Sequence, residues 1–127
     1  MDLLLDRSVL VGLRTPDRSA ELAEALRRHG HRRLFLSALV PGELLAGRPD
    51  QVRWTEQLAL RFPDRVLPAD AAVGRAWGAL GPAGAADPVA GLTAATALVH
   101  GLTVLSAEPE RYAGTGVPVL AAVPDRP

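Results

Sequence analysis

Four acidic residues follow segments of strand length or open a helix, which is where parallel sheets place their chemistry. Asp6 ends LLLD, Glu43 comes shortly after RLFLS, Asp87 precedes PVAGLTAATALVH, and Glu108 follows LTVLS. Because ligands of open parallel sheets bind at the carboxyl edge of the strands, we expect these acids to gather at one edge. Clustered carboxylates repel each other unless a cation lies among them, and such oxygen ligands select Mg²⁺ or Mn²⁺. The predicted metal ligands are Asp6, Glu43, Asp87 and Glu108.

The chemistry of such a site is phosphodiester hydrolysis. Divalent ions held by carboxylates activate a water molecule and stabilise the leaving oxygen, so no nucleophilic side chain is needed. We predict Asp6, Glu43 and Asp87 as the catalytic residues. The sequence has neither a glycine-rich phosphate loop nor a His-Glu zinc motif, which disfavours a generic nucleotide-binding domain.

Each acid taken alone has a simpler explanation. Asp6 is suited to cap the next turn, Glu43 to lie solvated on its helix, and Glu108 to be a loop acid. Asp87 stands directly before Pro88, and Asp followed by Pro is a strong signal for a helix start. Asp87 is therefore either a helix cap alone or a cap that also binds the metal.

Short apolar segments alternate with helical patterns along the chain, which predicts an α/β fold with a parallel sheet covered on both faces. The apolar, small-residue stretch 88–100 is predicted to be a helix buried on more than one side. The right-handed crossover rule favours the strand order 3-2-1-4-5, which makes the first strand central. The predicted strands are 3–6, 33–37, 65–68, 102–106 and 117–122.

Composition limits the classes of protein. The chain has 127 residues, the size of one domain (1–127), with 14 basic and 14 acidic residues and no cysteine. This balance argues against a purely electrostatic nucleic-acid binder, and the missing cysteines exclude disulfides and thiolate metal sites. The first residues lack the basic start and long apolar run of a secretory signal, so we expect a cytoplasmic protein.

Several other residues are of types that contact nucleic acid. Arg7 is well placed to meet a phosphate, although it is equally able to pair with a neighbouring acid. The basic segment LRRHGHRR (26–33) precedes the second strand, so we interpret it as a solvated helix end on the opposite edge. Trp54 and Trp77 lie among apolar neighbours and are predicted to be core or interface anchors.

Four segments together resemble the PIN-domain family, specifically the VapC-type toxin ribonucleases of bacterial toxin–antitoxin pairs. The resemblance covers essentially the whole chain, and Asp6, Ser8 and Glu43 match the family pattern. The segments are LLLDRSVL, LFLSALVPGELLAG, RVLPADAAVGRAWGAL and GLTAATALVHGLTVLSAEPERYAGTGVPVL.

The resemblance implies a three-layer α/β/α sandwich and an endoribonuclease site that uses Mg²⁺ or Mn²⁺ to cleave RNA. It also implies frequent dimerisation and a cognate VapB-type antitoxin that wraps a groove of the toxin. The predicted substrate-binding residues are Arg7, from its position next to Asp6, and Ser8, from the family pattern. We expect a homodimer, because the helix at 88–100 also has more apolar faces than one sheet needs.

The chain departs from the family pattern at two acidic positions. The third acid of the family precedes the threonine of the Ala-Ala-Thr-Ala run by six residues, and counting back from Thr96 gives Ala90. The fourth position, usually Asn or Asp, is Glu108. These departures leave two hypotheses: a metal-dependent ribonuclease toxin of reduced activity, or a degenerate PIN-like binding module that cleaves RNA poorly. If the metal site survives, Asp6, Glu43 and either Asp87 or Glu108 should converge on a common ion.

Overall fold

A computed structural model describes residues 2–122, so residue 1 and residues 123–127 of the predicted domain lie outside the described part. Five parallel strands form one sheet in the order β3-β2-β1-β4-β5, as predicted. Leu4 at the centre of β1 pairs with Phe35 on one side and with Val104 on the other. The strands are β1 (Leu3–Leu5), β2 (Leu34–Ser37), β3 (Val66–Leu67), β4 (Thr103–Ser106) and β5 (Val119–Ala121).

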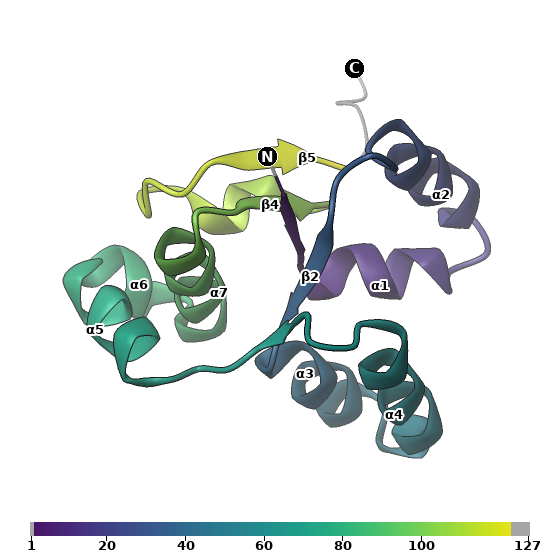
Figure 1. Ribbon diagram of the computed structural model, residues 1–127, viewed down its shortest axis with the longest axis horizontal. Helices are drawn as coiled ribbons and strands as arrows, with labels where there is room; N and C mark the ends of the chain where they lie inside the picture. The colour runs from purple at the N-terminus through teal and green to yellow at the C-terminus, as the bar shows by residue number, and fades with distance from the viewer. Residues whose placement is uncertain (1, 123–127) are drawn as a thin grey trace.

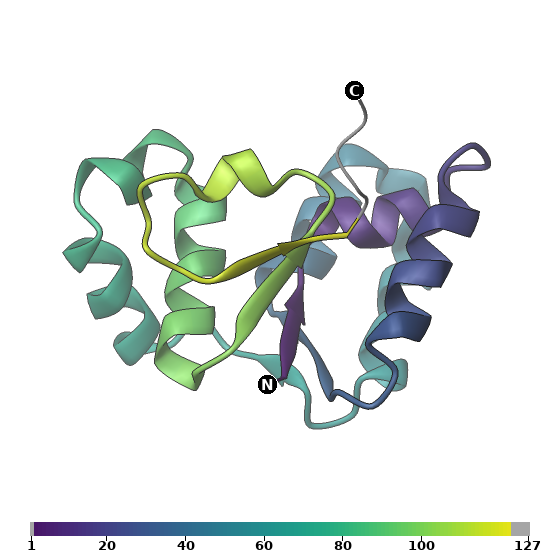
Figure 2. The same cartoon turned by 90° about the horizontal axis from the view of Figure 1, so that it is seen from above.

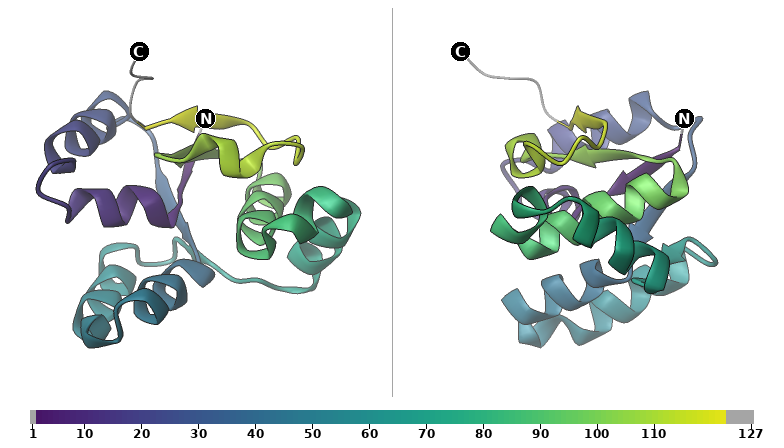
Figure 3. Two further views of the ribbon diagram at one scale, coloured as in Figure 1. Left: turned by 180° about the vertical axis from the view of Figure 1, so that it is seen from behind. Right: turned by 90° about the vertical axis from the view of Figure 1, so that its left-hand side faces the viewer.

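Helices cover both faces of the sheet, which gives the three-layer α/β/α sandwich (Figures 1 and 3). The helices are α1 (Arg7–Leu13), α2 (Ser19–Arg28), α3 (Leu39–Gly47), α4 (Val52–Arg61), α5 (Ala71–Ala79), α6 (Pro82–Ala86) and α7 (Pro88–His100). Two short 3₁₀ turns, η1 (Pro49–Gln51) and η2 (Pro109–Tyr112), complete the described part. Helices α1 to α4 lie on one face, and α5 to α7 lie on the other.

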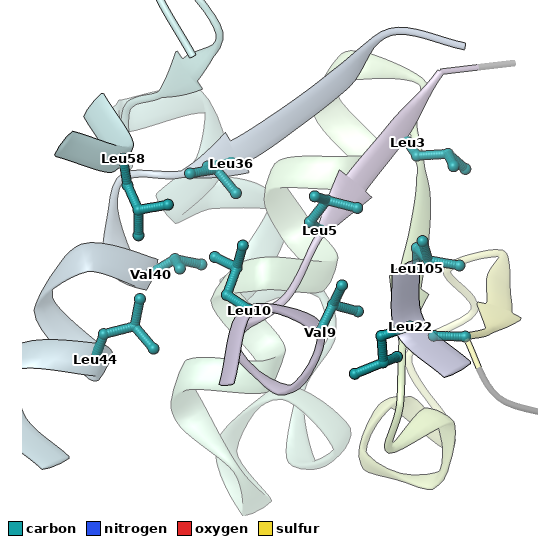
Figure 4. Packing of buried hydrophobic residues seen from close by; sticks show 11 residues of the cluster. Leu3, Leu5, Val9, Leu10, Leu22, Leu36, Val40, Leu44, Leu58 and Leu105 are labelled. Carbon is teal, nitrogen blue, oxygen red and sulfur yellow. The ribbon is translucent and has the colours of Figure 1, made fainter. Parts of the chain in front are cut away.

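Alternation along β1 divides the core between the two faces. Leu3 and Leu5 point toward α1 and α2, where they join the cluster that Figure 4 shows, including Val9 and Leu22. Leu4 points the other way and packs with small residues of α7 such as Ala94. A strand that buries both faces needs apolar residues at every position, which explains the uninterrupted leucine run.

Helix α7 spans the predicted residues, and its small side chains allow close packing on both sides. One side faces the sheet, while α5 and α6 of the same chain cover the other. A β-carbon on Gly91 would lie 2.4 Å from the carbonyl oxygen of Gly84, so the α6–α7 approach requires glycine there. The second apolar side of α7 is therefore covered within one chain, and the homodimer stays a prediction.

The observed strands are shorter than the predicted ones. Asp6 leaves β1 after Leu5 and caps α1, so the predicted strand 3–6 ends one residue early. The third predicted strand (65–68) and the fifth (117–122) also lose residues at both ends, because the observed strands are Val66–Leu67 and Val119–Ala121. Within residues 2–122 no helix combines the length and apolarity that crossing a membrane requires.

Candidate active site

The four predicted acids all lie toward the carboxyl edge of the sheet. In Figure 2 the strands β1 and β4 rise to the edge at which α1 and α7 begin and η2 turns. Asp6 directly follows the central strand, Glu43 is on α3, Asp87 caps α7, and Glu108 precedes η2. Their shared location agrees with the expectation from strand order.

Asp6 is buried, with 1% of its surface exposed, and it accepts hydrogen bonds at both carboxylate oxygens. Oδ1 accepts from the backbone N–H groups of Ser8 (3.0 Å) and Val9 (3.4 Å), as an N-cap does, and from the Ser8 hydroxyl. Oδ2 accepts from the Ser106 hydroxyl at 2.6 Å and from the Tyr112 hydroxyl at 2.8 Å. A carboxylate offers about four lone-pair positions, so these donors saturate it.

Ser8 and Ser106 extend this network to the chain after β4. The Ser8 hydroxyl accepts from the backbone N–H of Ala107 at 2.9 Å, and the Ser106 hydroxyl accepts from that of Glu108 at 2.9 Å. Asp6 and the two serines thereby join β1, α1 and β4. Ser8, a predicted substrate-binding residue, is buried and directs its hydroxyl inward.

Arg7 lies between two of the predicted ligands. Its Nε is 3.9 Å from Glu43 Oε2, and one of its terminal nitrogens is 4.0 Å from Glu108 Oε1. The Glu43 side chain is 14% exposed, whereas the side chains of Arg7 and Glu108 are about 40% exposed. Arg7 thus pairs with neighbouring acids, one of the two roles that its position predicts, and remains reachable from solvent.

Asp87 has two partners. Its Oδ1 accepts from the backbone N–H of Ala90 at 3.2 Å, which confirms the predicted N-cap. Arg111, which the sequence analysis did not single out, donates from Nε to Oδ2 at 3.1 Å and contacts Oδ1 at 3.4 Å. Asp87 is therefore a cap and an ion-pair partner, and both oxygens are engaged.

The electrostatics show how closely these groups lie together. Burial raises the pKa of Glu43, with Arg7 and Arg111 opposing and Asp6 and Asp87 reinforcing the shift. A hydrogen bond from Arg111 holds the pKa of Asp87 below its ordinary value. Burial and the negative charge of Asp6 raise the pKa of Tyr112 well above its ordinary value, so Tyr112 stays a neutral donor.

Solved structures of several complexes have the same fold. A FitAB complex bound to a DNA fragment matches with a TM-score of 0.77 and 22% identity over 94% of each chain. FitAcB from Neisseria gonorrhoeae matches at 0.74 and 21% over 94% of this chain and 97% of that chain. VapBC-1 from nontypeable Haemophilus influenzae matches at 0.70 and 17% over 96% and 98%. Among proteins of curated function, no sequence matches significantly.

The PIN-domain family model matches residues 3–113, which is most of the chain. The chain belongs to the PIN-domain family. PIN domains are generally nucleases, and these nucleases typically use divalent metals. Asp6, the predicted counterpart of the family's first acid, directly follows β1, the central strand of the sheet.

The acids of this PIN domain do not fit a divalent ion in the observed arrangement. Among residues 2–122, no three Asp, Glu or His side chains are placed to hold a metal. The expected convergence of Asp6 and Glu43 with Asp87 or Glu108 is therefore not found. The physical reason is that hydroxyl groups occupy Asp6, arginines pair with the other three acids, and Ala90 supplies no ligand at the third position.

Three residues of the site were missed by the sequence reasoning: Ser106, Tyr112 and Arg111. Ser106 gave a usable signal, because it ends the fourth strand beside the predicted edge. Tyr112 and Arg111 gave no such signal in the sequence. They lie in the short turn η2, whose direction depends on how the chain leaves β4. Tyr112 and its partner Asp6, and Arg111 and its partner Asp87, are each separated by more than 20 positions in the sequence.

Proposed function

We propose that this PIN domain is the toxin-type member of a toxin–antitoxin pair and that it binds its antitoxin in a groove on the α1–α2–α4 side. The groove, of about 690 Å³, supports this proposal. Most of its lining residues are apolar, three are arginines, and none is an acid. It is lined by Leu5, Leu10, Leu13, Arg14, Leu26, Leu34, Trp54, Gln57, Leu58, Arg61, Phe62 and Arg65.

The groove leads toward the acidic edge of the sheet. Arg14 and Trp54 also line a second hollow of about 310 Å³, whose other lining residues include Arg7 and Glu43. The Arg14 guanidinium carbon lies over the Trp54 ring, 4.2 Å from its centre, and this pair lines both hollows. An amphipathic helix with apolar anchors and acidic flanks is complementary to such a surface. The similarity in fold to FitAB and VapBC complexes supports a partner of this kind.

The test is to measure binding of the antitoxin encoded beside this chain's gene. Arg14→Glu places an acid on the groove, and we expect the Kd to rise at least about tenfold, since like charge at an interface costs upward of ~1.4 kcal/mol. Arg33→Glu is the matched control, because Arg33 pairs with Asp2 at the opposite edge of the sheet. Equal affinities for the two variants would exclude the groove as the binding site.

The second candidate function is the metal-dependent endoribonuclease, which would hydrolyse RNA with Mg²⁺ or Mn²⁺. The specific observation in its favour is that the negative charges of Asp6 and Asp87 contribute to the raised pKa of Glu43, so these acids lie near one another. Because the oxygens of Asp6 and Asp87 already have protein donors, we expect less cleavage than in a PIN domain with four acids. Incubation of mixed RNA with Mg²⁺, Mn²⁺ or EDTA, beside Asp6→Asn, tests this activity. Efficient cleavage that Asp6→Asn abolishes would make the ribonuclease the primary function.

The proposed oligomer is a homodimer, and a cytoplasmic location remains a prediction. Leu98 and Val99, near the end of α7, are 42% and 40% exposed and offer an apolar contact. Light scattering at micromolar concentrations distinguishes dimer from monomer. A dimer that persists in Leu98→Ser would place the contact elsewhere.

A further inference from the structure

Two arginines pair with the acids at the carboxyl edge of the sheet. Arg7 spans from Glu43 to Glu108, and Arg111 pairs through two of its nitrogens with Asp87. Three of the four predicted metal ligands therefore already face a guanidinium group. The fourth, Asp6, is held by neutral hydroxyl and backbone donors.

The arginines at this edge carry the same positive charge as one divalent metal ion. Four carboxylates lie here, and two guanidinium groups supply two positive charges, which is the charge of one divalent ion. Carboxylates at one site need a counter-charge, whether from a metal or from basic side chains. In this chain the covalently attached cations provide it.

Arg111 is firmly placed in this role. Its side chain is only 16% exposed. Burial acts to lower the pKa of Arg111, but the hydrogen bond and charge of Asp87, with smaller effects of Tyr112 and Glu43, raise it overall. A bidentate arginine–carboxylate pair of limited exposure is also among the more specific ion pairs in proteins. Arg7 is more exposed and pairs more loosely, so it is the more easily displaced of the two.

We propose that Arg7 and Arg111 replace the divalent cation in this PIN domain, so that the chain itself supplies the counter-charge of the site and the site does not bind Mg²⁺ or Mn²⁺. This inference rests on the proposed function, in which the domain acts by binding a partner. It also identifies what would have to change to restore a metal site. Removing the guanidinium groups would leave Glu43, Glu108 and Asp87 without the cations that now pair with them.

The experiment is a titration of the full chain with Mn²⁺. Binding is monitored by the melting temperature and by electron paramagnetic resonance of the bound ion. We expect wild type to show no change up to 10 mM Mn²⁺. The Arg7→Gln/Arg111→Gln double variant should gain a bound Mn²⁺ signal and melt about 4 °C higher at 10 mM Mn²⁺ than without it, as for a site with a Kd near ~1 mM. Arg33→Gln is the matched control, because it also frees one acid, Asp2, but at the opposite edge.

Two results would overturn the proposal. One is Mn²⁺ binding by wild type that Asp6→Asn or Glu43→Gln abolishes. The other is a double variant that gains no more Mn²⁺ than Arg33→Gln. If the double variant does not fold, Arg7→Gln alone, at the 40% exposed position, should still bind more Mn²⁺ than wild type.

The outcomes also separate this inference from the proposed function. Wild type that binds Mn²⁺ but does not cleave RNA contradicts only the arginine replacement. Wild type that binds neither Mn²⁺ nor the antitoxin contradicts only the proposed function.

Discussion

Replacing Tyr112 by Phe should destabilise the fold more than the loss of an ordinary hydroxyl does. Tyr112 is 3% exposed, packs in the core cluster that contains Ala90, and donates to Asp6 Oδ2 at 2.8 Å. The phenylalanine ring fills the same space, so the change removes the hydrogen bond and little else. A hydrogen bond to a charged group is worth about 1.5–3 kcal/mol, so we expect a loss of about 2 kcal/mol in the free energy of unfolding.

The assay is urea unfolding followed by tryptophan fluorescence and circular dichroism. With an m-value of about 2 kcal/mol/M, the loss corresponds to a midpoint lower by about 1 M urea. Thr96→Val is the matched control, because the Thr96 hydroxyl is fully buried and donates to the neutral carbonyl of Leu92 at 2.8 Å. Its removal should cost about 1 kcal/mol.

A double-mutant cycle locates the effect. In an Asp6→Asn background the acceptor carries no charge, so Tyr112→Phe should cost less there than in wild type, with a coupling of at least about 0.5 kcal/mol. If Tyr112→Phe costs no more than Thr96→Val and shows no coupling to Asp6, the buried carboxylate is not the acceptor that holds η2 against β1. The reasoning about the saturated Asp6 would then be refuted.

Three further predictions concern other parts of the edge and its supports. Gly91→Ala should lower the free energy of unfolding by about 1–3 kcal/mol in thermal unfolding, because its β-carbon would lie 2.4 Å from a backbone oxygen of α6. Gly74→Ala is the control and should cause no such loss, because the space around Gly74 is open. Burial raises the pKa of Glu43 in the folded protein, so wild type loses stability as the pH rises through that pKa and the carboxyl group ionises. Glu43→Gln has no group to ionise there. In urea unfolding, the free energy of unfolding of Glu43→Gln relative to wild type should therefore be higher at pH 7 than at pH 4. Asp87→Asn keeps the cap but loses the charge that pairs with Arg111. Since the Asp87 side chain is 44% exposed, the free energy of unfolding, measured in urea, should fall by less than about 1 kcal/mol.

The sequence alone determined the fold and the edge of the sheet at which the four acids gather. Alternating apolar and helical segments dictate parallel strands joined by helices, and a run such as Leu3–Leu5 that is apolar at every position belongs in the centre of a covered sheet. The Asp-Pro pair before α7 and the glycine after it set the helix bounds, because caps are local. The gathering of the acids at one edge follows from the parallel direction of the strands.

Only the tertiary structure decided what those acids do. Whether Asp6 offers a free oxygen depends on Tyr112 and Ser106, which are about 100 positions away and arrive only when β4 pairs with β1. The pairing of Arg111 with Asp87 likewise depends on the path of η2 over the start of α7. Spacing in a sequence fixes which residue types reach an edge, but the direction of each side chain is set by long-range packing. For this reason the acids that the sequence pattern predicts as metal ligands instead pair with arginines or accept hydrogen bonds from hydroxyl groups.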